Sequence, residues 1–491
     1  MFKHTAIFGL LILLLTACTA AATEVFISET AVPEKVETTP AATQQLPFSI
    51  LIREDEHYKL TAHAVDSETL ADLPEYAPLD FGHHNLHVLS PNGRTLALAS
   101  WPSGYNENGT LQLIDLTAWE VYTTTVTFDA YVQSLDFGSD GRTLYWAQPT
   151  DFDPPNYVPA EFVLYRYDLD SDMVTAVIPL PPLFSPQEMK LLNDGTEIAL
   201  YGTTSQIPIA TDAVPHLLLV DLTTETVRAD IPLEGVTSGQ YRLPNATNKT
   251  PFRIANPGLA WDLTQNLLYV VHAAEDKVTL VDLTAATIAR QVDIAPHQAI
   301  LERLMSLGVQ TAHAKMVPGS DKQAVLSPGG SHLFAIGLNR DLQNLEQGTL
   351  GWIWQETPLG LQIINTKDLT EASMLDLPAT NMALSPNGKW LLLTSAYDET
   401  RTTDGVVRVK HGLYVVDTES MAVTSHLLPD REVYLQGFSP NGRFAYISTA
   451  TSEWQGDHYE NWQTTLHVLD LETGQLTEER EFAGSYLQLI P

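Results

Sequence analysis

The feature that most constrains this chain is a short motif that recurs along its length, in which two apolar strands flank a Ser-Pro-Asn-Gly turn. The clearest copies begin at Val88, Ala383 and Gly437. Proline presets φ at the second turn position, and Asn-Gly supplies residues that tolerate left-handed φ. Looser copies with a related turn begin at Phe137, Leu191, Trp261 and Leu326. A unit that recurs in this way predicts one repeated supersecondary structure.

Each copy is followed by a second hairpin whose turn begins with an acidic residue. The residues at this position are Asp115, Asp168, Asp221, Asp282, Asp417 and Asp470, with Asn365 in the fifth repeat. An aspartate at the end of a strand accepts hydrogen bonds from the backbone amides of the turn that follows, so we assign these carboxylates a structural role. Asp168, Asp170 and Asp172 resemble the start of a calcium loop, but the Gly and the distal Glu of that loop are missing.

Two hairpins in each unit predict an all-β fold, a single β-propeller whose repeats of roughly 50 to 70 residues each form one four-stranded blade. Tyr434-Leu-Gln recurs as Tyr486-Leu-Gln near the last residue. We therefore expect the C-terminal strand to be the innermost strand of a blade whose other strands come from residues 48–70. This count gives eight blades, closed by pairing the N-terminal strands with the C-terminal strand. Seven blades are the alternative, if the fourth or the fifth repeat is an insertion.

Two features resemble known propeller repeats. The segment that begins Leu268-Tyr-Val-Val-His resembles the YVTN repeat of bacterial surface propellers. The Ser-Pro-Asn-Gly turns are similar to the WD40-like repeats of periplasmic propellers such as TolB. Together the resemblances cover most of residues 48–491. They imply the fold more strongly than the function, because such propellers include enzymes, scaffolds and adhesins.

The first residues predict export and attachment to a membrane. A positive start at Lys3 and an apolar run from Ala6 to Leu15 precede Cys18, the single cysteine of the chain. Leu15-Thr-Ala-Cys resembles the bacterial lipobox, which implies lipidation of Cys18 and stable anchoring by its acyl chains. An ordinary secretory signal is the alternative.

These features divide the chain into three parts. We expect a lipoprotein signal peptide over residues 1–17, the lipidated Cys18 and a flexible tether over residues 18–46, and the propeller over residues 47–491. The expected location is the bacterial cell envelope, where the lipid anchor holds the protein on the extracytoplasmic side of a membrane. The protein is expected to contact the membrane through this anchor only.

Charge and motif content exclude several function classes. The chain has 26 Lys+Arg against 60 Asp+Glu, a formal net charge of −34, so we expect it to bind no nucleic acid. A lone cysteine excludes an internal disulfide and a CxxC redox or metal motif. The sequence has no GxSxG elbow, HExxH motif or P-loop, so an enzyme is the less favoured interpretation. We assign no catalytic residue, metal or cofactor.

The candidate binding surface is the face of the ring that carries the long loops. Loops between the second and third strands are expected to be long and irregular, notably over residues 338–360, 397–412 and 451–465, and long loops on a rigid scaffold often bind ligands. The candidate binding residues, mostly aromatic, are Trp101, Tyr157, Trp352, Trp354, Tyr397, Trp454, Tyr459 and Trp462, with His83 and His84 on a nearby connection. The alternative is that these aromatic rings only pack the loops onto the blades.

Two further expectations concern the same face. His83 and His84 could meet His272, Glu275 or His313 there, but their spacing matches no known ligand motif. His87 begins a strand and is expected to be structural. The connection over residues 296–323 is expected to contain a helix at residues 299–307.

The combined features favour a membrane-anchored binding or scaffold propeller that recognises an envelope or extracellular protein, peptide or glycan through its long-loop face. One alternative is a lactonase-like or other hydrolytic propeller enzyme, which predicts convergent His, Asp and Glu residues at the mouth of the central tunnel. The other is a structural subunit of an envelope complex, which predicts an interface on the blade sides or on the short-turn face.

Overall fold

The structure is a computed structural model of the chain. It describes residues 48–54, 60–81, 86–100, 108–128, 130–150, 161–204, 214–241, 253–273, 275–294, 319–344, 352–402, 405–454, 459–483 and 487–490. These residues belong to one compact unit, Thr43–Pro491. Within the described part of the chain, no helix is both long and apolar enough to cross a membrane.

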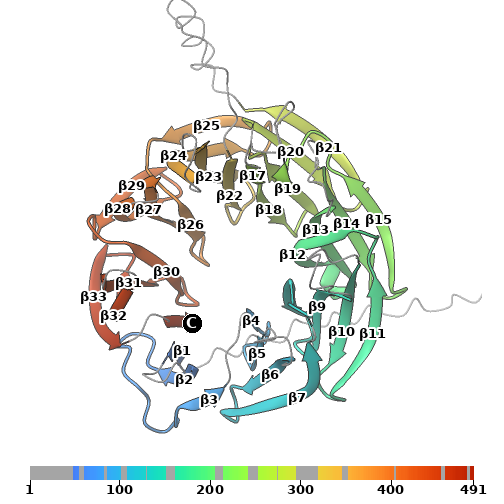
Figure 1. Ribbon diagram of the computed structural model, residues 1–491, viewed down its shortest axis with the longest axis horizontal. Coiled ribbons are helices and arrows are strands. Elements are labelled where there is room, and N and C mark those ends of the chain that lie inside the picture. Colours follow the sequence, from blue (N-terminus) through green and yellow to red (C-terminus); the bar gives the residue numbers. More distant parts are fainter. Residues whose placement is uncertain are drawn as a thin grey trace, which may run out of the picture. The chain divides into compact units, whose positions relative to one another are not determined.

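The strands form eight four-stranded antiparallel blades around a ring, which confirms the predicted eight-bladed β-propeller (Figure 1). In order from inner to outer strand, blades 1 to 4 consist of β34 (Leu487–Ile490), β1 (Ser49–Glu54), β2 (Leu60–Val65) and β3 (Leu79–Phe81); β4 (Leu86–Leu89), β5 (Thr95–Ala99), β6 (Gly109–Asp115) and β7 (Glu120–Phe128); β8 (Ser134–Phe137), β9 (Thr143–Pro149), β10 (Phe162–Asp168) and β11 (Met173–Pro179); and β12 (Phe184–Leu192), β13 (Glu197–Thr204), β14 (Pro215–Asp221) and β15 (Thr226–Pro232).

The fourth and fifth repeats of the sequence both form complete blades, so the seven-bladed alternative is wrong. In the same order, blades 5 to 8 consist of β18 (Gly258–Asp262), β19 (Leu267–Val271), β20 (Lys277–Asp282) and β21 (Thr287–Asp293); β22 (Gly319–Leu326), β23 (His332–Asn344), β24 (Trp352–Asn365) and β25 (Thr370–Leu375); β26 (Asn381–Leu384), β27 (Trp390–Thr402), β28 (Gly405–Asp417) and β29 (Ala422–Leu427); and β30 (Val433–Phe438), β31 (Phe444–Trp454), β32 (Tyr459–Asp470) and β33 (Gln475–Ala483).

Two short elements lie outside this pattern. The hairpin of β16 (Gly239–Tyr241) and β17 (Arg253–Asn256) is inserted between blades 4 and 5. A single 3₁₀ turn, η1 (Asn193–Gly195), joins the first two strands of blade 4.

The ring closes as predicted, by pairing the two ends of the propeller. Strand β34 runs antiparallel to β1, with Ile50 opposite Ile490 and Arg53 opposite Leu487. Figure 1 shows the C-terminus at the inner rim of the ring. Blade 1 is therefore the one blade assembled from two distant parts of the sequence.

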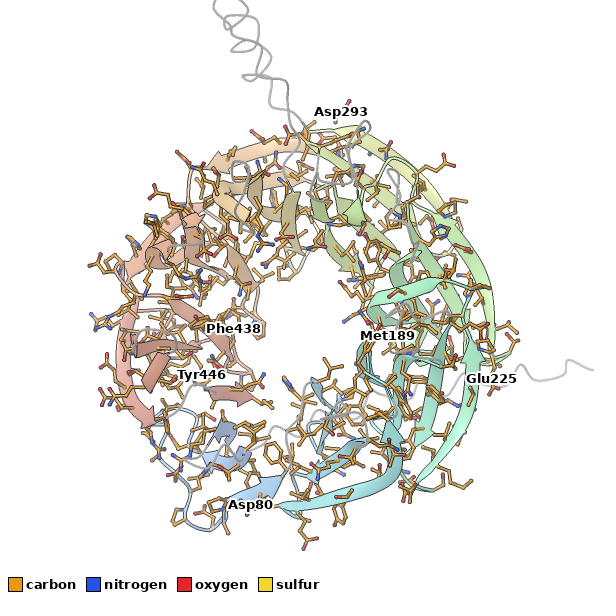
Figure 2. All side chains as sticks on the ribbon, viewed as in Figure 1. Asp80, Met189, Glu225, Asp293, Phe438 and Tyr446 are labelled. Atoms are coloured by element: carbon orange, nitrogen blue, oxygen red, sulfur yellow. The ribbon has the colours of Figure 1, made fainter. Side chains whose placement is uncertain are left out.

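The core lies between blades, because successive side chains of a strand point to opposite faces of the sheet. Ile50 and Ile52 pack in a cluster shared with blade 2, whereas Leu51 packs in a cluster shared with blade 8. The same division occurs at every boundary between neighbouring blades. In Figure 2, Met189 and Phe438 lie toward the inner rim, whereas Asp80, Glu225 and Asp293 lie at the outer rim.

The Ser-Pro-Asn-Gly turns are hairpin turns, as predicted, but their asparagine acts differently from the expectation. In the first clear copy only the glycine is left-handed, with φ 69° at Gly93. The Asn92 side chain accepts hydrogen bonds from the Arg94 backbone amide (3.0 Å) and the Ser90 hydroxyl (2.8 Å). Ser90 Oγ in turn accepts the Thr95 amide at 2.9 Å. The turns at Ser385 and Ser439 repeat these bonds.

The acidic turns also have the predicted role, because the carboxylate or amide oxygen at the strand end accepts backbone amides of its own turn in all eight blades. A second regularity was not foreseen. The residue four positions later is always left-handed, with φ between 51° and 68°. These residues are Leu70, Trp119, Asp172, Glu225, Ala286, Leu369, Met421 and Gly474.

This regularity gives a test with a built-in control. Ala286 is left-handed (φ 55°), whereas its neighbour Ala285 is not among the left-handed residues. Replacing either alanine by glycine loosens the unfolded chain to the same extent, but only Ala286→Gly also relieves backbone strain of about 1 to 2 kcal/mol. We therefore expect Ala286→Gly to be more stable than Ala285→Gly by about that amount in urea unfolding. Equal stability of the two variants would contradict the assignment.

The expectation of irregular long loops is wrong for blades 6, 7 and 8. Most of residues 338–360, 397–412 and 451–465 belongs to extended strand pairs β23–β24, β27–β28 and β31–β32. The helix expected at residues 299–307 lies outside the described residues.

Candidate functional site

Blades 6, 7 and 8 differ from the others in the length of their second and third strands. These strands have 11 to 14 residues, whereas the corresponding strands of blades 1 to 5 have 5 to 8. The added residues lie at the end where the second strand turns into the third. We name the described residues of 338–360, 396–412 and 450–465 the hairpin surface, and they lie on the predicted binding face.

The hairpin surface is a continuous structure, because strands of neighbouring blades pair there. Trp354 of β24 pairs with Arg401 of β27, which joins blades 6 and 7. The inserted strand β17 pairs with β22 in parallel, with Ala255 opposite Ser320. These contacts unite both blades and the inserted hairpin in one 10-stranded sheet.

A chain of ion pairs runs beneath this surface and begins at the inserted hairpin. Asn256 Nδ2 donates to Asp321 Oδ1 at 2.5 Å. The other oxygen of Asp321 lies 2.5 Å from Arg340 Nη1. Arg340 Nε donates to Glu356 Oε1 at 2.8 Å, so this part of the chain links β17, β22, β23 and β24.

The chain continues across blades 7 and 8. The second oxygen of Glu356 accepts the Asp398 backbone amide at 2.8 Å. Arg408 donates to Asp398 Oδ1 at 2.8 Å and grips Glu432 with two nitrogens, at 2.9 and 2.5 Å. Glu356 and Asp398 are only 8% and 6% exposed, so the arginines compensate carboxylates that have lost most of their water.

The titration of Glu432 shows that this pairing outweighs burial. Burial alone would raise the pKa of Glu432, but hydrogen bonds from Arg408 and Tyr434 hold the pKa below its ordinary value. Burial and the bond to Glu432 raise the pKa of Tyr434 to about 12. The network is therefore ionised at neutral pH and fixes the hairpins of three blades relative to one another.

One predicted binding residue can be placed with its side chain. Tyr397 lies on β27 within the hairpin surface and is half-buried. Its ring stacks on that of His411, with centroids 5.9 Å apart and an interplanar angle of 20°. This contact agrees with the packing alternative for the ring, although the partly exposed edge remains accessible to a ligand.

The other predicted residues fall into two groups. The first belongs by its backbone to the extended strands of the hairpin surface, and its side chains lie outside the description: Trp352 and Trp354 on β24, Trp454 on β31, and Tyr459 and Trp462 on β32. The second lies outside the described residues: Trp101, Tyr157, His83 and His84. Trp454 pairs with Tyr459 at the tip of the blade 8 hairpin.

The histidines that could be placed have hydrogen-bond partners. His87 on β4 lies 3.0 Å from Gln488 Nε2 of β34, and burial lowers its pKa. His272 lies 2.7 Å from the Thr279 hydroxyl, and burial lowers its pKa to about 4. Among the residues with described positions, no cluster of three or more His, Cys, Asp or Glu could hold a metal ion.

Two acidic residues on inner strands have perturbed titration. Burial raises the pKa of Asp136 on β8 and of Glu188 on β12. Glu188 accepts the Trp261 indole N–H at 2.5 Å, so it links blades 4 and 5. The sequence signal for both was a charged residue within a short apolar strand, which the sequence analysis did not use.

Comparison with known proteins extends the fold assignment only. No protein-family model matches the chain, and no curated protein matches its sequence. Among solved structures, the chain is similar to dihydro-heme d1 dehydrogenase NirN in complex with DHE, with a TM-score of 0.50, 11% identity, and 93% of this chain and 78% of that chain covered. The shared property is the fold.

The chain is also similar to Kuenenia stuttgartiensis hydrazine synthase, with a TM-score of 0.37 and 14% identity over 70% of this chain and 77% of that chain.

Proposed function

We propose that this chain is a membrane-anchored extracytoplasmic scaffold that binds a protein or peptide partner through the hairpin surface. The anchor is the lipid expected at Cys18, joined to the propeller by residues 18–46. The propeller serves as a rigid support, and recognition is by binding with no chemical step.

The observation that supports the proposal is the joint extension of three consecutive hairpins. Each extended hairpin exposes more backbone and side chain than a propeller needs for closure. The ion-pair network from Asp321 to Glu432 holds these hairpins in one arrangement. A surface ordered before binding loses less conformational entropy when a partner docks.

The surface also offers apolar contact area. Val407 on β28 is 55% exposed, and Tyr434 at the adjacent end of blade 8 is 46% exposed. Apolar and aromatic side chains with a charged surround are typical of protein interfaces. Arg408 and Glu432 supply the charges next to both residues.

The test is capture of partners from solubilised cell envelope by the full chain in detergent, with Val407→Asp as the test variant. A carboxylate placed in an apolar contact must lose its water on binding, so we expect at least a tenfold loss of captured partner, measured by quantitative mass spectrometry. Val177→Asp is the matched control, because Val177 on β11 of blade 3 is also 55% exposed but lies away from the hairpin surface.

The outcomes separate the proposal from its alternatives. A protein that is lost with Val407→Asp and kept with Val177→Asp supports the proposal. A protein kept by both variants would place binding on the blade sides or the short-turn face and overturn it. Capture of protease-resistant carbohydrate in place of protein would also overturn it, in favour of a glycan ligand.

A further inference from the structure

A polar hollow lies between blades 4 and 5 on the face opposite the hairpin surface. Its volume is about 420 Å³, and its walls include the side chains of Asn193, Glu197, Asp221, Arg228, Asn266 and Thr284. These residues come from the short turns and adjoining strand ends of the two blades. The volume lies within the range of small-molecule sites in proteins.

The hollow exists because blade 4 carries an unusual residue at a repeated position. Glu197 begins the second strand and lies opposite Asp221, the acidic turn residue. The residues at the same position of blades 2, 3, 5, 6, 7 and 8 are Thr95, Thr143, Leu267, His332, Trp390 and Phe444. Glu197 is thus the one acidic residue among these seven, and it occupies less space than the aromatic rings of blades 7 and 8.

Glu197 is 6% exposed, so its charge needs partners within the protein. It has two: Arg228 Nε donates to one carboxylate oxygen, and Asn193 Nδ2 donates to the other at 2.9 Å. The carboxylate is therefore held in a fixed direction at the wall of the hollow.

Arg228 also departs from a repeated pattern. Arginines of several blades donate to a carbonyl in the acidic turn of the next blade, as Arg166 does to Leu222 and Arg228 does to Leu283. Arg166 also pairs with Glu225, a carboxylate of that next blade, at 2.9 Å. Blade 5 has Ala286 at the position equivalent to Glu225, so Arg228 pairs with Glu197 of its own blade. The short alanine leaves open space beside the guanidinium.

We propose that this hollow binds a neutral polyhydroxylated ligand, the size of one hexose unit. A sugar hydroxyl donates one hydrogen bond and accepts others, so it needs acceptors and donors side by side. The carboxylates of Glu197 and Asp221 accept, the Arg228 guanidinium donates, and the amides of Asn193 and Asn266 do both.

Other ligand classes fit the walls less well. An anion would lie close to two carboxylates, and an organic cation would lie close to Arg228. An apolar ligand would cover these polar groups without satisfying their hydrogen bonds. The site does not depend on the hairpin surface, since the two lie on opposite faces.

The test titrates the full chain with D-glucose, D-galactose, D-mannose and N-acetyl-D-glucosamine, measured by saturation-transfer difference NMR. The main variant is Thr284→Phe, which places a ring at the rim of the hollow from an exposed turn position. Thr117→Phe is its matched control, because Thr117 is exposed and occupies the same turn position in blade 2, two residues after the acidic residue. Glu197→Gln removes the charge of the wall.

We expect saturable binding of at least one of these sugars by the unmodified chain and by Thr117→Phe. Thr284→Phe should abolish this binding, and Glu197→Gln should weaken it at least tenfold. Absence of saturable binding for all four sugars would overturn the proposal, and so would binding that survives Thr284→Phe. Thermal unfolding of each variant shows whether Glu197→Gln remains folded, and the conclusion rests on Thr284→Phe if it does not.

Discussion

Deletion of residues 487–491 is expected to abolish the cooperative folding of the propeller. Strand β34 is the inner strand of blade 1, and its loss leaves the inner edge of β1 unpaired. The same strand contributes Leu489 to the cluster between blades 1 and 8, and Ile490 to the cluster between blades 1 and 2. We expect the single unfolding transition in urea, followed by circular dichroism, to be lost or replaced by a broad change.

A point substitution measures part of the same effect. Leu489 is 1% exposed, so Leu489→Ala should lower the free energy of unfolding by about 3 kcal/mol. Leu263, which is 45% exposed, provides the control, and Leu263→Ala should change the free energy by about 0.5 kcal/mol or less. A truncated chain that unfolds at the same urea concentration as the full chain would show that β34 is not needed for closure.

Arg408→Leu is expected to destabilise blades 7 and 8 by about 2 to 3 kcal/mol. The substitution leaves Asp398 and Glu432 without the guanidinium that pairs with both. Breaking a fully buried ion pair costs about 3 to 5 kcal/mol, and the expected loss is smaller because Arg408 is partly exposed. Urea unfolding at pH 7 measures the change.

The control for this substitution is Arg142→Leu in blade 3. Arg142 pairs with Asp170 at 2.9 Å, but both side chains are largely exposed. Exposed pairs contribute about 0 to 1 kcal/mol, so Arg142→Leu should be close to neutral. Equal losses for the two variants would mean that the network under the hairpin surface stabilises no more than an ordinary surface pair.

The dependence on pH gives a second measurement for Arg408→Leu. The pKa of Glu432 is lower in the folded protein than its ordinary value, so its contribution to stability is complete above that ordinary value. The contribution is lost as the pH falls through the lowered pKa. The difference in stability between the unmodified chain and Arg408→Leu should therefore shrink in acid.

Most of the fold could be predicted because each blade repeats the same local signals. The turn at Ser90 to Gly93 and the acidic turn at Asp115 depend on neighbouring residues only, and both formed as expected. The closing strand was also predictable, since Tyr486-Leu-Gln copies Tyr434-Leu-Gln. Regular repeats make such local information sufficient for the architecture.

The hairpin surface was harder to predict, because glycine interrupts its strands. Gly360 and Gly412 have φ of 85° and 70° and lie at register shifts or next to them, so they form bulges where the sequence suggested strand ends. The alternation of Val407, Arg408, Val409 and Lys410 did indicate a strand and was overlooked. The ion network joins residues as far apart as Asp321 and Glu432, and no local pattern specifies such pairs.

The seam between β1 and β34 also has a consequence for the order of folding during synthesis. Blades 2 to 8 each come from one continuous stretch, so each can form as soon as its own residues have left the ribosome. Blade 1 must keep an unfinished edge until nearly the whole chain has been made, because Ile50 pairs with Ile490. Contacts between such distant residues form slowly. A chain that stalled before Leu487 would hold seven finished blades and one open edge, a template for pairing with another copy.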